Sequence, residues 1–483
     1  MNIEIDNQSG KTLYTKFTGN SLTLGSGSAD LTIDQAKTGS YDLDSVSSGR
    51  IYFSLDKALS SDAPDGANPG DPDYYTKFDK VEITFDAANG GKANLTAVDF
   101  FAIPFTIQTY IEDGSTEIAI QQFHLASGKT GSDLATAIEG AGSSTTAMQV
   151  TKDGTTRRWL SPVKAPSAYT SLQAYVTAIQ GNSSKVTIQG TYYGSPAKTY
   201  NYSSEVSGNY LKLTMANEKE IQIPFSSLAS AIYTCDGEYY LDGDTSTPHH
   251  VSENDFYAAV YRDVVASMNL GYYDGTKGND STGWWGSASP YSGANSSGHY
   301  NDYAAEILKV YPGAYGFPFS DRQRTVLLNL AGSSSQVPTS KIKITVLDDS
   351  TAPTIDTLPG VLNPQTGDAT FNVVPVFADD IQGMEMHFSG KTFKAGFANF
   401  FSGTPAASNL NNGRAAQING VPAQEGWNKY DFQIGTVPYM VLAKAENKVV
   451  TKAVISGGAS STFTSPNLFT GSMATQGGKI SDS

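Results

Sequence analysis

The chain has 483 residues, enough for two or three domains, and its formal net charge is −15. An acidic chain argues against binding to nucleic acid or to an anionic membrane surface, both of which need a basic footprint, whereas a neutral polysaccharide would not be repelled. The single cysteine, Cys235, excludes an internal disulfide and a cysteine metal cluster, and no run of 18 apolar residues predicts a membrane-spanning helix.

Residues 1–118 are predicted to form β-strands. Apolar residues alternate or run together in NIEIDN, GRIYFSL, KVEITFD and NLTAVDFFAIPFTIQ, with turn residues between these segments. The segment 60–73, SSDAPDGANPGDPD, is too polar and too rich in proline and glycine for regular structure. This pattern is typical of short strands joined by tight turns and loops.

Residues 119–245 are predicted to form an inserted α/β lobe. SDLATAIEG and AYTSLQAYVTAIQ have apolar residues at helical spacing, while KVTIQGTYYG and YLKLTMA have the pattern of strands. Further helices are predicted over 253–270, which starts with acidic residues, and over 299–312, which ends at a proline.

From about residue 347 the pattern changes again. DDSTAPTIDTLPG is predicted to be a linker, and FNVVPVFA, MEMHFSG and segments near 438–455 are predicted to be strands of a further β domain. The tail from residue 456 is rich in Gly, Ser and Thr, and part of it is expected to be disordered.

The segment 81–105 contains two carboxylates that could act together. Alternation along KVEITFD places Glu82 on the face opposite the apolar side chains. If the two strands of this segment pair symmetrically about Gly90 and Gly91, Glu82 faces Asp99. Opposed like charges destabilise a sheet, whereas acid/base chemistry needs one carboxyl that holds a proton beside another that stays ionised. The alternative is that both are solvated charges on an exposed sheet face.

Several segments resemble, in order, those of thaumatin-like proteins, and more closely the bacterial β-1,3-glucanases of glycoside hydrolase family 64. They are GRIYFS, KVEITFD with NLTAVDFFAIPF, RRWLSPVK, YTCDG and AYGFPFSD, spread over about residues 1–345. Plant thaumatin-like proteins are rich in disulfides, so the single cysteine favours the bacterial enzymes. The resemblance implies a mainly β protein with a thaumatin-like sandwich or barrel core, 1–118 and 246–346. The inserted α/β lobe would be 119–245, and the additional C-terminal β domain, 347–483, is left unexplained.

The resemblance also implies a function, the internal hydrolysis of β-1,3-glucan with release of short oligosaccharides. Glu82 falls on the family's general acid and Asp99 on its general base. Family members invert the anomeric carbon, and inverting enzymes keep their carboxyls about 6.5–9.5 Å apart so that a water fits. Direct cross-strand pairing would bring the two carboxyls nearer the shorter spacing of retaining enzymes, so the two arguments disagree.

Nine further residues are candidates for substrate binding. They are Arg50, Tyr74, Tyr75, Thr84, Asp86, Asn94, Trp284, Trp285 and Asp321. The arginine could hold a carboxylate ionised or donate hydrogen bonds to hydroxyl groups, and the polar residues of the hairpin flank the carboxylate pair. The aromatic residues stand in polar loops and could stack on sugar rings, and the last aspartate resembles a cleft aspartate of the family. A structural or surface role is the alternative for each.

No cofactor and no metal are expected. The fragment DGDTST, 242–247, resembles part of a calcium loop but lacks the glycine and glutamate that complete one, so turn chemistry is favoured. The expected location is outside the cell or at its surface, although MNIEIDNQSG contains no apolar signal segment. Two other functions stay open: a glucan-binding protein without catalysis, and a cell-surface adhesive protein that uses its C-terminal domain.

Overall fold

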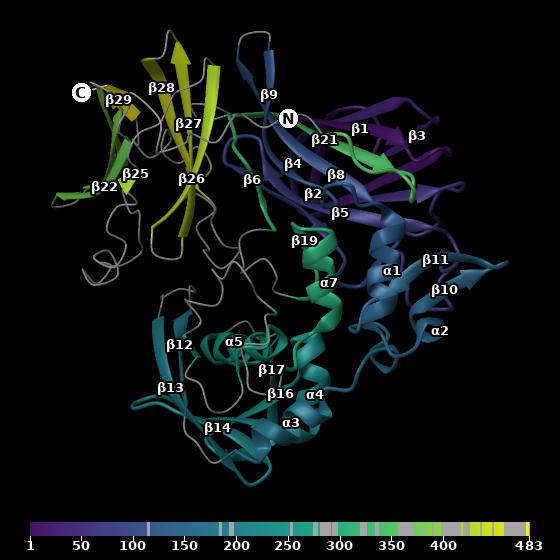
Figure 1. Cartoon of the computed structure of the whole chain (residues 1–483), viewed down its shortest axis with the longest axis vertical. Helices are drawn as coiled ribbons and strands as arrows, with labels where there is room; N and C mark the ends of the chain where they lie inside the picture. Colours follow the sequence, from purple (N-terminus) through teal and green to yellow (C-terminus); the bar gives the residue numbers. More distant parts are fainter. Residues whose placement is uncertain are drawn as a thin grey trace.

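Strands make up most of the regular structure, which confirms the mainly β fold class predicted from the sequence (Figure 1). The computed structural model describes residues 1–355 without 114–115, 183–185, 193–197, 252–254, 274–278, 281–290, 292–297, 319–325 and 334–337, and it describes strands between residues 371 and 482. Figure 1 shows a large sheet at the upper right, a second sheet with its helices below, and the C-terminal strands at the upper left.

The large sheet combines the first part of the chain with a strand near residue 340. Its strands are β1 (Asn2–Gln8), β2 (Leu13–Ser26), β3 (Asp30–Ile33), β4 (Thr38–Leu55), β5 (Phe78–Asp86), β6 (Gly90–Thr96), β8 (Phe105–Asp113), β9 (Thr116–Phe123), β19 (Ala314–Tyr315), β20 (Leu328–Leu330) and β21 (Thr339–Leu347). The pairing path runs β19-β6-β5-β4-β1-β21-β8-β9, with β2 joined to β3 and β4 and with β20 joined to β6. Parallel pairing of β1 with β21 sets Ile3 beside Ile342, so the sheet needs both parts of the chain.

The central strands of this sheet bury one face and leave the other face polar. On β5, Val81, Ile83 and Phe85 are at most 4% exposed and belong to the hydrophobic core. Successive side chains on a strand point to opposite faces, so Glu82 and Thr84 lie on the other side of the sheet. This polar face of β4, β5 and β6 is where a groove can form without loss of core.

The second sheet carries three helices. Its strands are β12 (Val186–Tyr192), β13 (Lys198–Ser207), β14 (Tyr210–Thr214), β15 (Ile221–Pro224), β16 (Glu238–Leu241), β17 (Asp244–His250) and β18 (Asn279–Asp280). Helix α5 (Phe256–Asn269) packs on β12 and β15 and touches α4 (Phe225–Thr234), which in turn touches α3 (Gln173–Gln180). Helix α5 begins where the Asp255 carboxylate accepts a hydrogen bond from the Ala258 N–H at 2.7 Å, a side-chain cap of the kind that starts helices.

The remaining elements connect the two sheets. A small sheet is formed by β10 (Gln149–Lys152), β11 (Thr155–Leu160) and β7 (Phe100–Phe101), beside α1 (Gly131–Ala141), α2 (Thr145–Met148) and the 3-10 turn η1 (Pro166–Ala168). Helix α7 (Asp302–Val310) packs against α1 and β19 and lies between the two sheets in Figure 1. The helices predicted near 253–270 and 299–312 are therefore confirmed as α5 and α7, each shorter at both ends.

The boundaries predicted for the inserted lobe, 119–245, stay a prediction. Two contacts lie close to these boundaries. Near the first boundary, β9 pairs with β8 in the large sheet, and beyond the second, α5 packs against the second sheet. None of the helices in the described part of the chain is long and apolar enough to cross a membrane.

Strands occupy the C-terminal segments in which the sequence predicts them, as β22 (Phe371–Ala378), β23 (Ile381–Phe388), β27 (Val437–Glu446) and β28 (Val449–Gly457). Four further strands were not predicted: β24 (Lys391–Phe397), β25 (Gln417–Ile418), β26 (Gly426–Ile434) and β29 (Ile480–Asp482), the last of them in the Gly/Ser/Thr-rich tail. They form two sheets, in the orders β25-β22-β23-β24-β29 and β26-β27-β28.

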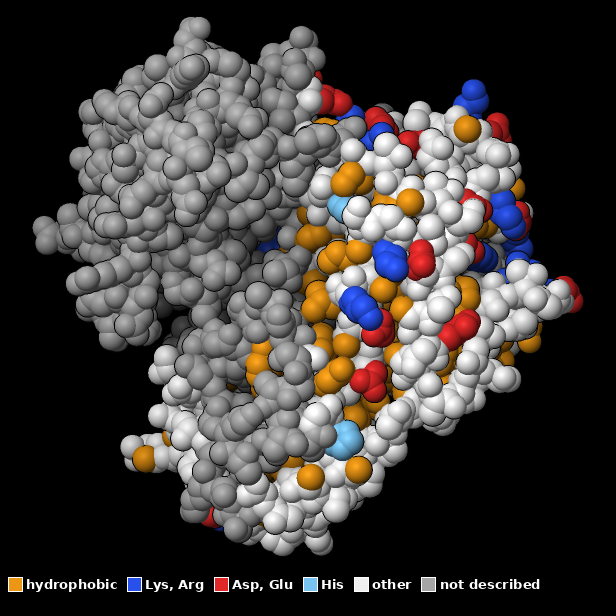
Figure 2. Space-filling model, in the orientation of Figure 1, with side chains coloured by type: hydrophobic (Ala, Val, Ile, Leu, Met, Phe, Trp, Pro, Cys, Tyr) orange, Lys and Arg blue, Asp and Glu red, His pale blue; other side chains and the backbone are white. Residues whose placement is uncertain are grey.

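On the face shown in Figure 2, the described charged side chains are scattered, with both signs interspersed. This part of the surface carries no basic stripe of the kind that nucleic-acid-binding proteins present.

Candidate active site

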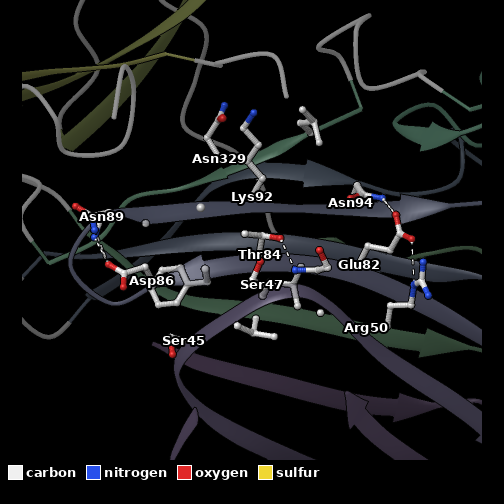
Figure 3. A pocket seen from close by; sticks show the side chains of 18 of the residues that line it. Ser45, Ser47, Arg50, Glu82, Thr84, Asp86, Asn89, Lys92, Asn94 and Asn329 are labelled. Atoms are coloured by element: carbon white, nitrogen blue, oxygen red, sulfur yellow. Dashed lines mark hydrogen bonds and ion pairs between the residues drawn. The ribbon is translucent and has the colours of Figure 1, made fainter. Parts of the chain in front are cut away.

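A groove of about 810 Å³ lies over the polar face of β4, β5 and β6 (Figure 3). It is lined by five of the residues predicted to form the site: Arg50, Glu82, Thr84, Asp86 and Asn94. In Figure 3 the first two and the asparagine gather at one end of the groove, and Asp86 with Asn89 lies at the other. The groove therefore joins one of the two predicted catalytic carboxylates to a row of polar side chains.

Both oxygens of Glu82 are engaged by neighbouring side chains. Arg50 Nε lies 3.4 Å from Oε1, and Asn94 Nδ2 donates a hydrogen bond to Oε2 at 3.1 Å. The two partners come from the strands on either side, because Arg50 pairs with Glu82 across β4–β5 and Asn94 pairs with it across β5–β6. The carboxyl is thereby oriented toward the groove while its side chain stays 29% exposed.

The symmetric pairing that predicts Asp99 opposite Glu82 is wrong. The hairpin closes with Asp86 opposite Gly90, so its centre lies earlier than the two glycines, and Asn94 faces Glu82. The reason is local: the Asp86 carboxylate accepts hydrogen bonds from the N–H groups of the next turn, at 3.1 Å from residue 88 and 2.8 Å from residue 89. An aspartate that bonds to the backbone two or three residues ahead favours a tight turn at that point.

Asp99 lies outside the paired strands, in the connection between β6 and β7. Lys80 Nζ donates to Asp99 Oδ2 at 2.7 Å, and Lys164 Nζ lies 3.6 Å from Oδ1. Burial alone would raise the pKa of Asp99, but Lys80 most strongly, then Lys164 and Arg50, hold that pKa below its ordinary value of 3.8. Asp99 is therefore an ionised carboxylate at any pH near neutrality.

Arg50 ties the two carboxylates into one cluster. It contacts Glu82 directly, and its charge also lowers the pKa of Asp99. Lys80 stands two residues before Glu82 on the same face of β5, and its side chain is 8% exposed. Two acidic groups and three cations are thus linked in one cluster, of which Arg50 and Glu82 line the groove while Lys80, Asp99 and Lys164 are not part of its lining.

A β-bulge in β4 directs Arg50 into this cluster. Val46 pairs with Phe85 and Gly49 with Ile83, so β4 has one residue more than β5 between these pairs. The close approach needs glycine, since a Cβ on Gly49 would lie 2.5 Å from a methyl group of Val46 and 2.8 Å from the Ile83 carbonyl oxygen. Beyond the bulge, regular alternation resumes and places Arg50 on the groove face.

We expect Lys80→Met to move the acid limb of the pH–rate profile to higher pH. If Asp99 is the general base that the sequence predicts, kcat/KM falls as the pH drops through its pKa, which in the native protein lies below 3.8, because a general base must be ionised. Without Lys80, only the more distant Lys164 and Arg50 would favour the ionised form. The ion pair between Lys80 and Asp99 also stabilises the fold. This stabilisation is fully present above the pKa that Asp99 has in the unfolded chain, and it is lost as the pH falls through the lower pKa that Asp99 has in the folded protein. Lys164→Met removes a partner that lies farther from Asp99, at 3.6 Å, so it should shift the acid limb of the profile less. An acid limb that does not move in Lys80→Met would contradict the role of Asp99 as the base that titrates.

The two predicted tyrosines lie beside the small sheet. The rings of Tyr74 and Tyr75 meet edge to face at 4.8 Å, and Lys152 Nζ lies 5.3 Å from the Tyr75 ring. Neither belongs to the lining of the groove described above. Trp284, Trp285 and Asp321 lie outside the described residues. A role in substrate binding stays a prediction for all five.

Sequence reasoning missed Lys80 and Lys164, the two lysines that pair with Asp99 and lower its pKa. Lys80 could have been found, because strand alternation places it on the same face as Glu82. Lys164 could not, since it lies in the loop after β11 and approaches Asp99 only through the pairing of β11 with β7.

No metal site is found in the part of the chain that the structure describes, where no three His, Cys, Asp or Glu side chains gather closely enough to hold an ion. The first two residues of the DGDTST segment form the hairpin turn between β16 and β17, and the other four begin β17. Asp242 and Gly243 at its tip both have positive φ, at 52° and 77°, as turns that join adjacent antiparallel strands require.

Comparison with known proteins places this chain in one family. A family model for glycoside hydrolase family 64, described as β-1,3-glucanase, matches residues 3–346. A solved laminaripentaose-producing β-1,3-glucanase in complex with laminaritetraose is 19% identical, covers 72% of this chain and 98% of its own, and superposes with a TM-score of 0.53, which shows a shared fold. A β-1,3-glucanase domain from Clostridium beijerinckii (16% identity, 72% and 97% covered, TM-score 0.46) and a laminaripentaose-producing β-1,3-glucanase from Paenibacillus barengoltzii (18% identity, 71% and 74% covered, TM-score 0.41) also match. The search of curated proteins found no match.

Proposed function

Because this chain belongs to glycoside hydrolase family 64, the β-1,3-glucanases, we propose that it cuts β-1,3-glucan within the polymer chain and inverts the anomeric carbon. Glu82 is the general acid and Asp99 the general base of this reaction. The observation that carries the assignment is the contrast between the two carboxyls: Asp99 is held ionised by Lys80 and Lys164, while Glu82 lines the groove.

The chemistry follows from these positions. Glu82 gives a proton to the glycosidic oxygen as the bond from that oxygen to the anomeric carbon breaks. Asp99 takes a proton from a water that attacks the same carbon from the opposite face. One turnover leaves Glu82 ionised and Asp99 protonated, and exchange with solvent restores both. Arg50 and Asn94, which bind the two oxygens of Glu82, orient the acid.

The strand register supports inversion over retention. Lys80 and Glu82 are two residues apart on one face of β5, a rise of about 6.7 Å. Asp99 is bound to Lys80 and not opposite Glu82, so the two carboxyls are offset along the sheet. Such an offset suits the spacing of about 6.5–9.5 Å that inverting enzymes need for a water.

The length of the groove supports a cut inside the polymer. From Glu82 to Asp86, four residues of β5 span about 13 Å, which is longer than one hexose ring. Ser45, Thr84 and Lys92 line this stretch and offer hydrogen-bonding groups to sugar hydroxyls (Figure 3). A polymer of this size is met outside the cell, so we expect secretion or attachment to the cell surface.

Digestion of linear β-1,3-glucan tests the proposal. We expect the average polymer length to fall early, short oligosaccharides to accumulate, and proton NMR of the new reducing ends to show the α-anomer first. Glucans with other linkages, incubated in parallel, serve as controls for linkage specificity. Binding without products would favour a glucan-binding protein, and a first-formed β-anomer would contradict inversion.

A further inference from the structure

The turn that carries Asp99 is anchored by a second, buried carboxylate. Asp79 is the neighbour of Lys80 on β5, but it points to the core face of the sheet and is 3% exposed. Its Oδ2 accepts hydrogen bonds from the backbone N–H groups of Ala102 at 2.7 Å and Ile103 at 3.1 Å. The segment that follows Asp99 is therefore tied to the strand that carries the acid.

A buried serine holds the other side of the same turn. Ser161 is 0% exposed and directly follows β11. Its backbone N–H donates to the Asp99 carbonyl oxygen at 3.0 Å, and its hydroxyl donates to the carbonyl oxygen of Val98. The backbone of residues 98–103 is thus fixed by Ser161 at its start and by Asp79 at its end.

The charge on Asp79 is costly in this position. Burial raises the pKa of Asp79 to about 6, and Lys80 and three backbone N–H groups oppose this by favouring the ionised form. Arg158, itself fully buried, lies over the rings of Phe78 and Phe100 at 4.1 and 5.0 Å and contributes a compensating positive charge. A buried charge destabilises a fold unless hydrogen bonds and partners offset it.

We propose that Asp79, together with Ser161, is a positioning residue for the general base: it fixes the backbone turn that places the Asp99 carboxylate behind the anomeric carbon. The proposal rests on the function proposed above for Asp99. Lys80 and Lys164 hold the charged end of Asp99, whereas Asp79 and Ser161 hold its backbone. Asp79 does not touch the substrate, and it acts only through the placement of this turn.

Azide rescue of Asp79→Asn tests this role. Asparagine keeps the size of the side chain but has one accepting oxygen in place of two, so its NH2 group must face either the Lys80 N–H or the N–H groups of Ala102 and Ile103, and the turn should shift. We expect kcat on β-1,3-glucan to fall about 100-fold with KM nearly unchanged, since a displacement of about 1 Å can cost that much. Azide needs no deprotonation, so it should attack the anomeric carbon directly, restore bond cleavage and yield the α-glycosyl azide in both Asp79→Asn and Asp99→Asn.

Asp73→Asn is the matched control. Asp73 is also fully buried and accepts two backbone N–H bonds, from Ser60 at 2.8 Å and Ser61 at 3.0 Å, but these belong to another loop. Its substitution should lower the melting temperature, with kcat near that of the native enzyme and no response to azide.

Two results would overturn the proposal for Asp79: a native kcat in Asp79→Asn, or a loss of kcat that azide does not restore while Asp99→Asn is restored. If Asp99→Asn itself keeps native turnover, the function proposed for Asp99 fails first and the positioning role falls with it.

If Asp79→Asn does not fold, the variant Ser161→Ala provides the test. We expect its kcat to be about 10-fold lower and to be restored by azide. Ser54→Ala, which removes another buried hydroxyl that donates to a backbone carbonyl at 2.8 Å, is its control.

Discussion

Glu82→Gln is expected to lower kcat on β-1,3-glucan about 1,000-fold while glucan binding and the melting temperature stay nearly unchanged. Glutamine has no proton to give to the leaving oxygen, and general acid catalysis contributes between about 100-fold and 10,000-fold. The amide keeps the shape of the side chain and can still accept from Arg50, while Asn94 can turn its amide to accept from the new NH2 group. Steady-state kinetics with a binding isotherm measured on the same variant check this expectation.

A substrate with a very good leaving group separates lost acid catalysis from general damage. A dinitrophenyl glycoside of a β-1,3-oligosaccharide leaves without protonation, so Glu82→Gln should cleave it at close to the native rate. Glu4→Gln, at a carboxylate on β1 that contacts Lys341 and does not line the groove, is the control and should behave as the native protein on both substrates. Equal losses on glucan and on the activated substrate would remove Glu82 from the role of acid.

Asp99→Asn is expected to lose about 1,000-fold or more in kcat on glucan and on the activated substrate alike. The attacking water lacks a base in this variant, and a better leaving group does not supply one. The substitution also leaves Lys80 and Lys164 without their carboxylate partner, so the melting temperature should fall at neutral pH. Rates on both substrates, with and without azide, measure the effect.

The anomeric configuration of the products decides between two roles for Asp99. First-formed α-products agree with a base that activates water. Near-native turnover in Asp99→Asn would instead show that another group activates the water. Retained configuration would make Asp99 the nucleophile and would require a shorter distance to Glu82 than the observed register suggests.

Local patterns in the sequence were sufficient to locate many of the strands and helices. Alternation in KVEITFD separates Val81, Ile83 and Phe85 from Glu82, and the structure buries the first set in the core. Helical spacing located α5 and α7, since periodicity reports which face of an element is apolar. The long apolar run NLTAVDFFAIPFTIQ was less informative, because it is divided between β6, β7 and β8, and apolar content does not mark where a strand stops.

The sequence by itself determined that this protein is mainly β, that Glu82 stands on a polar strand face, and, through ordered motifs, that it resembles the family whose model matches residues 3–346. Only the tertiary structure decided what surrounds the two carboxyls. The register of a hairpin depends on where its turn closes. Hydrogen bonds to Asp86 close this turn before Gly90, so Asn94 and not Asp99 faces Glu82. Lys164 and Ser161 reach Asp99 through contacts between segments about 60 residues apart, which follow from strand pairing and packing and leave no periodic trace in the sequence.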